Sequence, residues 1–224
     1  LCALTGIANC ADTTLNVPEK TRIDVAETDW PWWRGPNRNG IAAAEQRLPL
    51  NWGERDNVLW KADVPGRGHG SPIVVGDQVV LATADEEALT QSVLCFDRNT
   101  GRELWRTVVH RGGLATKGNK KSTQASSTLA CDGERFFANF LNSDAVYTTA
   151  LSRDGEQLWQ QKITDYVVHQ GYGSSPAVYG PLVIVSADNK GGGAIAALDR
   201  ATGSIAWKHQ RPELPNYTSP IILP

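Results

Sequence analysis

A pattern that recurs along the chain constrains its fold more than any other feature of the sequence. Each copy opens with a Ser-Pro or Ser-Thr pair before a β-rich run, continues through Asp-x-x-Thr-Gly and ends at a tryptophan. The first copy runs from Ser71 to Trp105 and the third from Ser175 to Trp207, and in both the aspartate precedes the tryptophan by eight residues. A fourth copy begins at Ser219. Because two copies share this spacing, the pattern indicates a structural repeat rather than a set of unrelated hairpins.

The second copy is degenerate. It opens at Ser127-Thr128, replaces Asp-x-x-Thr-Gly with the shorter segment 152–155 and reaches Trp159 with one residue fewer. Before the first copy, residues 58–64 around Trp60 are expected to form an outermost strand alone. The tryptophans at 60, 105, 159 and 207 are 45, 54 and 48 residues apart. This period is typical of the four-stranded blades of a β-propeller.

The chemistry of the repeat predicts its place in a blade. Asp-x-x-Thr-Gly suits the turn between the third and fourth strands, since Asp and Thr side chains bond local amides and glycine adopts positive φ. The tryptophan can then cover the seam to a neighbouring blade. Runs of β-branched residues at 73–75, 79–81 and 182–185 favour strands over helices. The predicted structural residues of turns and seams are Asp97, Thr100, Gly101, Trp105, Trp159, Asp199, Thr202, Gly203 and Trp207.

We therefore predict an all-β fold: an incomplete β-propeller of four-stranded antiparallel blades, with about three full blades and partial ones beside them. Residues 58–224 form this propeller. Residues 29–57 are a loop-rich lead-in with four tryptophans, for which capping the propeller is favoured over an aromatic binding surface. Residues 12–28 are interpreted as a linker. Residues 1–11 are small and apolar, which fits a signal-peptide remnant or, more plainly, a disordered terminus.

Composition argues against several classes of function. The net charge of −2 gives no overall field that would attract nucleic acid or a membrane surface. No stretch approaches about 20 apolar residues, so no transmembrane segment is expected. The four cysteines, at 2, 10, 95 and 131, lack zinc-site spacing, so no metal site is expected. Cys95 and Cys131 are interpreted as small buried residues, with a disulfide between them left open.

The repeat resembles that of the quinoprotein alcohol dehydrogenase-like superfamily, the PQQ-binding-like β-propeller repeat proteins, which include relatives of the outer-membrane assembly protein BamB. The tryptophan-docking motif of this superfamily reads Ala-x-Asp-x-x-Thr-Gly-x-x-x-Trp. Residues 197–207 match it fully, and residues 95–105 match it with Cys95 in place of alanine. The opening at 30–41 resembles the lead-in of secreted bacterial members. The resemblance covers residues 29–224 and implies a periplasmic or secreted protein, with Cys10 allowing a lipoprotein.

The dehydrogenases of this superfamily hold PQQ on the propeller axis with a Ca²⁺ ion, a catalytic aspartate and commonly two adjacent cysteines. This sequence has no adjacent cysteines, and Asp97 and Asp199 belong to the turns. We therefore expect no catalytic, cofactor-binding or metal-binding residue, and a non-catalytic binding or scaffolding module. The alternative is a fragment of a PQQ-dependent alcohol dehydrogenase-like oxidoreductase, with PQQ and Ca²⁺ as cofactors. A sugar or polymer binder that uses the tryptophan-rich lead-in is a third interpretation.

Blade topology predicts where a protein or polymer partner would bind. In a four-stranded antiparallel blade, the loops between strands two and three share a face with the blade-to-blade connections. The connection at 111–124 carries four basic residues and no acidic one, which favours an anionic partner, although a solvated loop is the plainer interpretation. The candidate binding residues on this face are His69, Lys117, Lys120, Lys121, His169, Tyr172, Asp188, Asn189 and Lys190.

Overall fold

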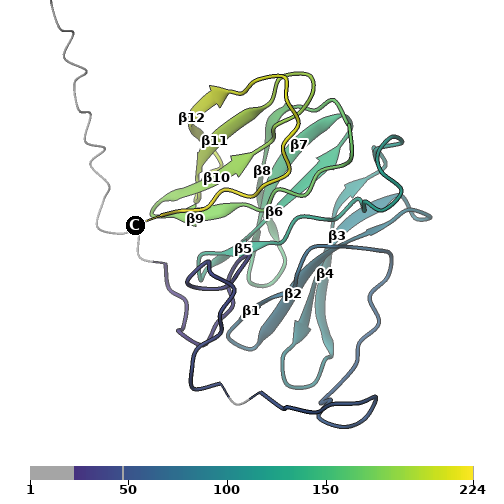
Figure 1. Ribbon diagram of the computed structural model, residues 1–224, viewed down its shortest axis with the longest axis vertical. Coiled ribbons are helices and arrows are strands. Elements are labelled where there is room, and N and C mark those ends of the chain that lie inside the picture. Colours follow the sequence, from purple (N-terminus) through teal and green to yellow (C-terminus); the bar gives the residue numbers. More distant parts are fainter. Residues whose placement is uncertain (1–22, 47, 224) are drawn as a thin grey trace, which may run out of the picture.

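The computed structural model describes residues 23–46 and 48–223, and its strands form three separate four-stranded sheets (Figure 1). The predicted signal-peptide remnant and residues 12–22 of the predicted linker lie outside this description. The strands are β1 (Ile73–Val75), β2 (Gln78–Asp85), β3 (Thr90–Asp97), β4 (Glu103–Arg111), β5 (Ala130–Cys131), β6 (Arg135–Asn142), β7 (Ala145–Ser152), β8 (Gln157–Asp165), β9 (Ala177–Tyr179), β10 (Leu182–Ser186), β11 (Ala194–Asp199) and β12 (Ile205–Gln210).

Each sheet is an antiparallel meander, with strand orders β1-β2-β3-β4, β5-β6-β7-β8 and β9-β10-β11-β12. The predicted all-β class and the four-stranded antiparallel blades are therefore confirmed. Within the described residues, no helix is long and apolar enough to span a bilayer.

The same irregularity occurs in the outer half of every blade. The tryptophans of β4, β8 and β12 pair with the small residues Cys95, Ala150 and Ala197, and the register then shifts by one residue. A bulge of this kind bends the strand and increases its local twist. The small partner and the bulge therefore give each tryptophan ring the same position in its blade.

Two hydrophobic clusters hold the three blades together, one on each side of the middle sheet. Neighbouring phenylalanines of β6 point to opposite faces, so Phe136 belongs to the cluster shared with the first blade and Phe137 to the one shared with the third. Both rings are fully buried. Burying a side chain of this size stabilises the fold by roughly 1.5–3 kcal/mol. The middle blade is thus buried on both faces, as stacking of blades requires.

A ladder of hydroxyl groups links the first strands of successive blades. The backbone N–H of Ser71 donates to Thr128 Oγ1 at 2.9 Å, and that of Thr128 donates to Ser175 Oγ at 3.0 Å. The N–H of Ser175 donates in turn to Ser219 Oγ at 2.9 Å. Thr128 is therefore the structural equivalent of the opening serine in the degenerate copy. The recurring hydroxyl residue bonds one blade to the next.

The lead-in crosses the first strands of all three blades. Trp30 forms an antiparallel bridge with Val74 of β1, and the Pro31 carbonyl accepts the N–H of Cys131 in β5 at 2.8 Å. The Arg38 guanidinium donates to the Val178 carbonyl of β9 at 2.7 Å. It also stacks on the indole of Trp32, which is only 6% exposed, at 4.4 Å from the ring centroid. These contacts agree with a capping role for this part of the lead-in.

The strand expected at 58–64 does not form, so that prediction is wrong. An extended segment becomes a strand only when a neighbouring strand accepts its hydrogen bonds, and among the described residues none pairs with 58–64. Trp60 nevertheless contacts the first blade, because its indole N–H donates to the Arg98 carbonyl at 2.8 Å.

Candidate functional site

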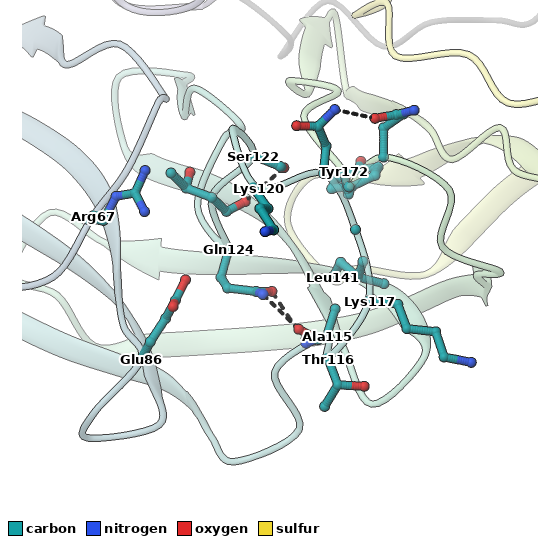
Figure 2. Close-up of a pocket in the computed structure, with 15 residues that line it drawn as sticks. Arg67, Glu86, Ala115, Thr116, Lys117, Lys120, Ser122, Gln124, Leu141 and Tyr172 are labelled. Atoms are coloured by element: carbon teal, nitrogen blue, oxygen red, sulfur yellow. Dashed lines mark hydrogen bonds between the residues drawn. The ribbon is translucent and has the colours of Figure 1, made fainter.

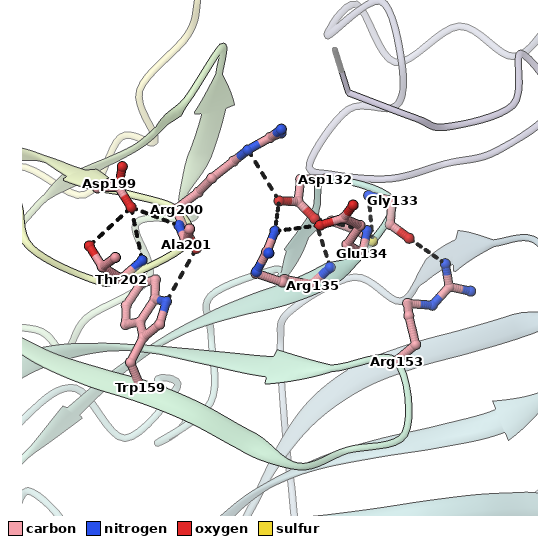
Figure 3. Close-up of polar contacts among 11 residues, drawn as sticks. Asp132, Gly133, Glu134, Arg135, Arg153, Trp159, Asp199, Arg200, Ala201 and Thr202 are labelled. Carbon is pink, nitrogen blue, oxygen red and sulfur yellow. Dashed lines mark hydrogen bonds and ion pairs between the residues drawn. The ribbon is translucent and has the colours of Figure 1, made fainter. Parts of the chain in front are cut away.

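The predicted turn residues lie between the third and fourth strands of the first and third blades. Asp97 Oδ1 accepts hydrogen bonds from the N–H groups of Asn99 and Thr100 and from the Thr100 hydroxyl, at 3.0, 2.8 and 2.7 Å. The bonds from Thr100 favour the ionised carboxyl and lower the pKa of Asp97. Asp199 accepts the same three bonds, two of them from Thr202 (Figure 3).

The corresponding turns of the second and third blades each receive a tryptophan from the preceding blade. The indole N–H groups of Trp105 and Trp159 donate to the carbonyls of Arg153 and Arg200, at 2.9 and 3.2 Å. The tryptophan of one blade therefore reaches the turn of the next. Trp207 makes no hydrogen bond of this kind among the described residues, and its ring lies 5.4 Å from that of His209.

Arginines that follow the first residue of these turns cross to the preceding blade. Arg200 Nε lies 3.4 Å from a carboxyl oxygen of Asp132, whose side chain is almost fully buried (Figure 3). Arg153 donates to the Val75 carbonyl of the first blade at 2.9 Å and to the Gly133 carbonyl of its own blade at 3.0 Å. The sequence offered no signal for these contacts beyond an arginine in each turn. This face of the propeller is closed by bonds between blades.

The opposite face carries the loops predicted to bind a partner. A hollow of about 260 Å³ lies between the β2–β3 loop, the β4–β5 connection and the β8–β9 connection (Figure 2). It brings together the predicted residues Lys117, Lys120 and Tyr172. It also includes Arg67 and Glu86, which were not singled out although both lie at the edges of loops assigned to this face.

Side-chain amide groups fix the walls of this hollow. The Gln124 side chain donates to the Ala115 carbonyl at 2.8 Å and accepts the Ala115 N–H at 3.3 Å. Gln91, which is fully buried, donates to the carbonyls of Gln124 and Leu141 at 2.8 and 2.9 Å. A buried amide that lost these partners would be costly to leave unpaired. The β4–β5 connection is therefore held in one conformation.

The two connections that border the hollow are also bonded to each other. The Asn119 N–H donates to the Gln170 carbonyl at 2.9 Å, and the Asn119 side-chain amide donates to Gln170 Oε1 at 2.6 Å. The Tyr166 hydroxyl donates to the Gly171 carbonyl at 2.8 Å. A preformed hollow with fixed polar groups is typical of a binding site.

Three cations and one carboxylate line the hollow. These are Arg67, Lys117, Lys120 and Glu86, and within the described residues none of the four makes an ion pair. Figure 2 shows Lys120 over the hollow and Lys117 pointing away from it. The local charge is thus positive although the chain as a whole carries −2. Such a hollow attracts anionic groups.

The other predicted face residues divide into exposed and buried ones. His69, Lys121, His169 and Lys190 are exposed. Asp188 is 4% exposed and binds Arg211 at 3.0 Å. Asn189 is 1% exposed and accepts the N–H groups of Val167 and Gly191, at 3.1 and 2.8 Å. These two residues hold their loop in place, and the structure does not bring them to the surface.

Tyr172 is also buried, and its hydroxyl is bonded to both the second and the third blade. It donates to the Ser186 carbonyl at 3.1 Å and accepts from the Asn139 amide at 3.3 Å. Burial raises the pKa of Tyr172 well above its usual range. Tyr172 therefore forms part of the floor of the hollow as a neutral, fixed group.

The two described cysteines give the chain no disulfide and no reactive thiol. Cys95 and Cys131 are buried and free, so the disulfide left open by the sequence is not formed. Burial raises the pKa of each thiol to about 12, which keeps both protonated and unreactive. Within 23–46 and 48–223, no group of three or more His, Cys, Asp or Glu residues is placed to hold a metal ion.

Comparison with known proteins places these repeats in a family. The model of a PQQ-like repeat family, described as outer membrane protein assembly factor BamB, matches residues 50–146 and 89–222. A polyvinylalcohol dehydrogenase of a Pseudomonas species is 26% identical over 83% of the chain and 30% of its own length. The outer membrane protein assembly factor BamB of Burkholderia pseudomallei is 28% identical over 70% of the chain and 34% of its own length. The chain thus spans about a third of the curated relatives that it matches.

Solved structures show the same fold. The quinohemoprotein alcohol dehydrogenase from Comamonas testosteroni superposes with a TM-score of 0.55 and 18% identity, over 85% of the chain and 28% of that structure. A europium-containing methanol dehydrogenase superposes with a TM-score of 0.50 and 21% identity, over 66% of the chain and 25% of that structure. The three sheets are therefore blades of a propeller of this kind.

Proposed function

Because this chain belongs to the PQQ-like β-propeller repeat family described as outer membrane protein assembly factor BamB, we propose that it is a binding and scaffolding module of the cell envelope. We place it in the periplasm or outside the cell, and its role is non-catalytic. The observation that carries the proposal is the preformed hollow on the face of the inter-blade loops. Rigid sheets position these loops, which is how propellers and similar scaffolds present binding residues.

The partner is a macromolecule that contacts the inter-blade face. Several loops on this face of the propeller are exposed and polar, and they surround the hollow with cationic side chains. The opposite face is closed by tryptophan and arginine contacts between blades. This difference supports binding of the partner on the inter-blade face rather than on the face of the turns.

Photo-crosslinking in the intact protein tests the location of the partner. A photoreactive amino acid would replace Lys121 or Lys190 on the inter-blade face, and Asn99 or Ala201 in the opposite turns as matched exposed controls. The proposal predicts crosslinks to a defined partner from the first pair and none from the second. Crosslinks confined to Asn99 and Ala201 would show that the binding face is the opposite one.

A second function has one specific observation in its favour. The match to a polyvinylalcohol dehydrogenase covers 83% of the chain, which is more than the match to BamB covers. Under this function the chain is part of a PQQ-dependent oxidoreductase. An alcohol-dependent dye reduction assay of the intact protein with added PQQ and Ca²⁺ distinguishes the two functions. The oxidoreductase function predicts turnover, and the scaffolding function predicts none.

A further inference from the structure

The hollow on the inter-blade face is one of several that share walls. It shares Ala115, Thr116 and Lys117 with a neighbouring hollow of about 520 Å³ that reaches Tyr166, Val167 and Val168. It shares Glu86, Ala115, Thr116 and Gln124 with a hollow of about 380 Å³ that reaches Leu89 and Leu114. The three hollows meet at Ala115 and Thr116, and together they form what we call the inter-blade groove. A groove of this shape suits an extended ligand rather than a compact one.

Apolar side chains mark both ends of the inter-blade groove. Leu89 is 53% exposed, and its backbone has a φ of 53°, a conformation that non-glycine residues seldom adopt. Val167, at the other end, is also 53% exposed. An exposed leucine in a left-handed turn contributes little to packing, and a position of this kind points to a functional contact.

The centre of the inter-blade groove is cationic. Arg67 is held there by its backbone, which bridges Ala84 of β2 with N···O distances of 2.8 and 3.0 Å. Lys117 and Lys120 are carried by the connection that Gln124 and Asn119 fix in place. Side chains on a rigid backbone lose less freedom when a ligand binds, so the cations are prepared for an anionic group.

We propose that the inter-blade groove binds an extended acidic segment of a partner polypeptide, with its carboxylates over Arg67, Lys117 and Lys120 and its apolar side chains at the two ends. A polypeptide offers acidic and apolar side chains in one chain, whereas a polyol polymer offers only hydroxyls. The inference rests on the proposed function and names the chemistry of the partner.

The test is a titration of the intact protein with a fluorescein-labelled peptide in which glutamates are flanked on both sides by leucines, followed by fluorescence anisotropy. The double variant K117Q/K120Q should weaken binding about fivefold at low salt, since each exposed ion pair contributes only modestly to affinity. The matched control R102Q/K208Q removes two charges from a turn of the opposite face and from β12, and should leave the affinity unchanged.

Two further variants probe the rest of the inter-blade groove. Glu86→Gln should tighten binding about twofold, because Glu86 is the carboxylate that lines the central hollow together with Arg67 and Lys120. Asp144 and Asp165 line the hollow at the Val167 end, where Asp165 is paired with Lys162. Leu89→Asn should weaken binding while the fold is kept, since asparagine tolerates the left-handed backbone of this turn. Raising the ionic strength should weaken binding to the wild-type protein and have less effect on K117Q/K120Q.

The inference is overturned if the peptide does not bind, if R102Q/K208Q weakens binding as much as K117Q/K120Q, or if a peptide with glutamine in place of glutamate binds equally well. Competition by polyvinyl alcohol at matched chain length would assign the groove to a polyol instead and would equally overturn it. If position 121 crosslinks to a partner but the peptide does not bind, the scaffolding function stands and this inference is wrong. If neither crosslinking nor peptide binding is seen, the proposed function is wrong as well.

Discussion

At the residue scale, the glycines that end the turns between third and fourth strands lie directly beneath tryptophan rings. Gly155 has a φ of 84°, and a Cβ added there would lie 2.6 Å from the Trp105 ring. Gly203 has a φ of 76° and the same distance to the Trp159 ring. Two constraints therefore select glycine at these positions, the left-handed backbone and the close approach of the indole.

Gly155→Ala separates these two constraints when it is compared with Gly112→Ala. Gly112 has a similar φ of 71°, but a Cβ there would meet nothing within 4 Å. We expect Gly112→Ala to cost about 1–2 kcal/mol of unfolding free energy through backbone strain alone. Gly155→Ala should cost about 1–3 kcal/mol more, because the indole must move. If urea unfolding shows equal losses of unfolding free energy for Gly112→Ala and Gly155→Ala, the tryptophan contact contributes nothing to the requirement for glycine.

His110 makes stability depend on pH. Its ring packs against Phe140 and Tyr147 at 5.9 and 5.4 Å, and its Nε2 has no hydrogen-bond partner within the described part of the chain. Burial disfavours the charged imidazolium and lowers the pKa of His110 to about 4, from 6.5. Between these values the unfolded chain binds more protons than the folded one. The contribution of neutral His110 to the free energy of unfolding is therefore fully present above about pH 6.5 and is lost as the pH decreases toward 4.

The His110→Phe variant measures this contribution. Urea midpoints at pH 7.5 and 4.5 should differ less in the variant than in the wild type, because the titrating group is removed while the aromatic packing is kept. Other acidic groups, such as Asp97, whose pKa is lowered by its turn, leave a residual slope in both proteins. An unchanged difference between the two midpoints would refute the role given to His110.

At the element scale, the outer strands are joined to the next blade through their tryptophans. Trp105 packs against the cluster between the first two blades, and Trp159 packs against the cluster between the second and third. Trp105→Ala and Trp159→Ala should each destabilise the 224-residue chain by about 2–3 kcal/mol, less than for a fully buried aromatic ring, because both rings are half-buried. Trp207→Ala should cost clearly less in this chain. Equal losses at all three positions, measured by denaturant unfolding, would contradict the seam contacts.

The sequence predicted those features that depend on local patterns. The turns at Asp97 and Asp199 and the four-stranded blades follow from the repeat, because a turn is specified by residues close together in the chain. The strand at 58–64 was predicted wrongly because pairing depends on a neighbour, which the local pattern does not reveal. Sequence reasoning also missed Arg200, whose contact with Asp132 joins segments far apart in the chain.

The candidate site was predictable in outline and not in detail. Blade topology placed on one face the loops that line the hollow, and these loops supply Lys117 and Lys120 to it. The direction of a side chain within a loop depends on the folded backbone, so the burial of Asp188 and Asn189 could not be read from the sequence. Gln91, which fixes the wall of the hollow, lies in the strand β3 and carried no signal of its own.

At the scale of the whole molecule, the two faces of the propeller differ in structure. Indole and guanidinium groups close one face by bonding each blade to the next. The other face carries the inter-blade groove, with walls fixed by side-chain amides and a cationic centre. The central claim is that a partner binds this second face.

Hydrogen–deuterium exchange of the intact protein, with and without the acidic peptide, tests that claim most directly. The account predicts slower amide exchange in the β4–β5 connection, 112–124, and in the β8–β9 connection, 166–173, when the peptide is bound. Exchange in the opposite turns, 97–103 and 199–204, should not change. Protection confined to those turns, or no protection anywhere at saturating peptide, would contradict the account.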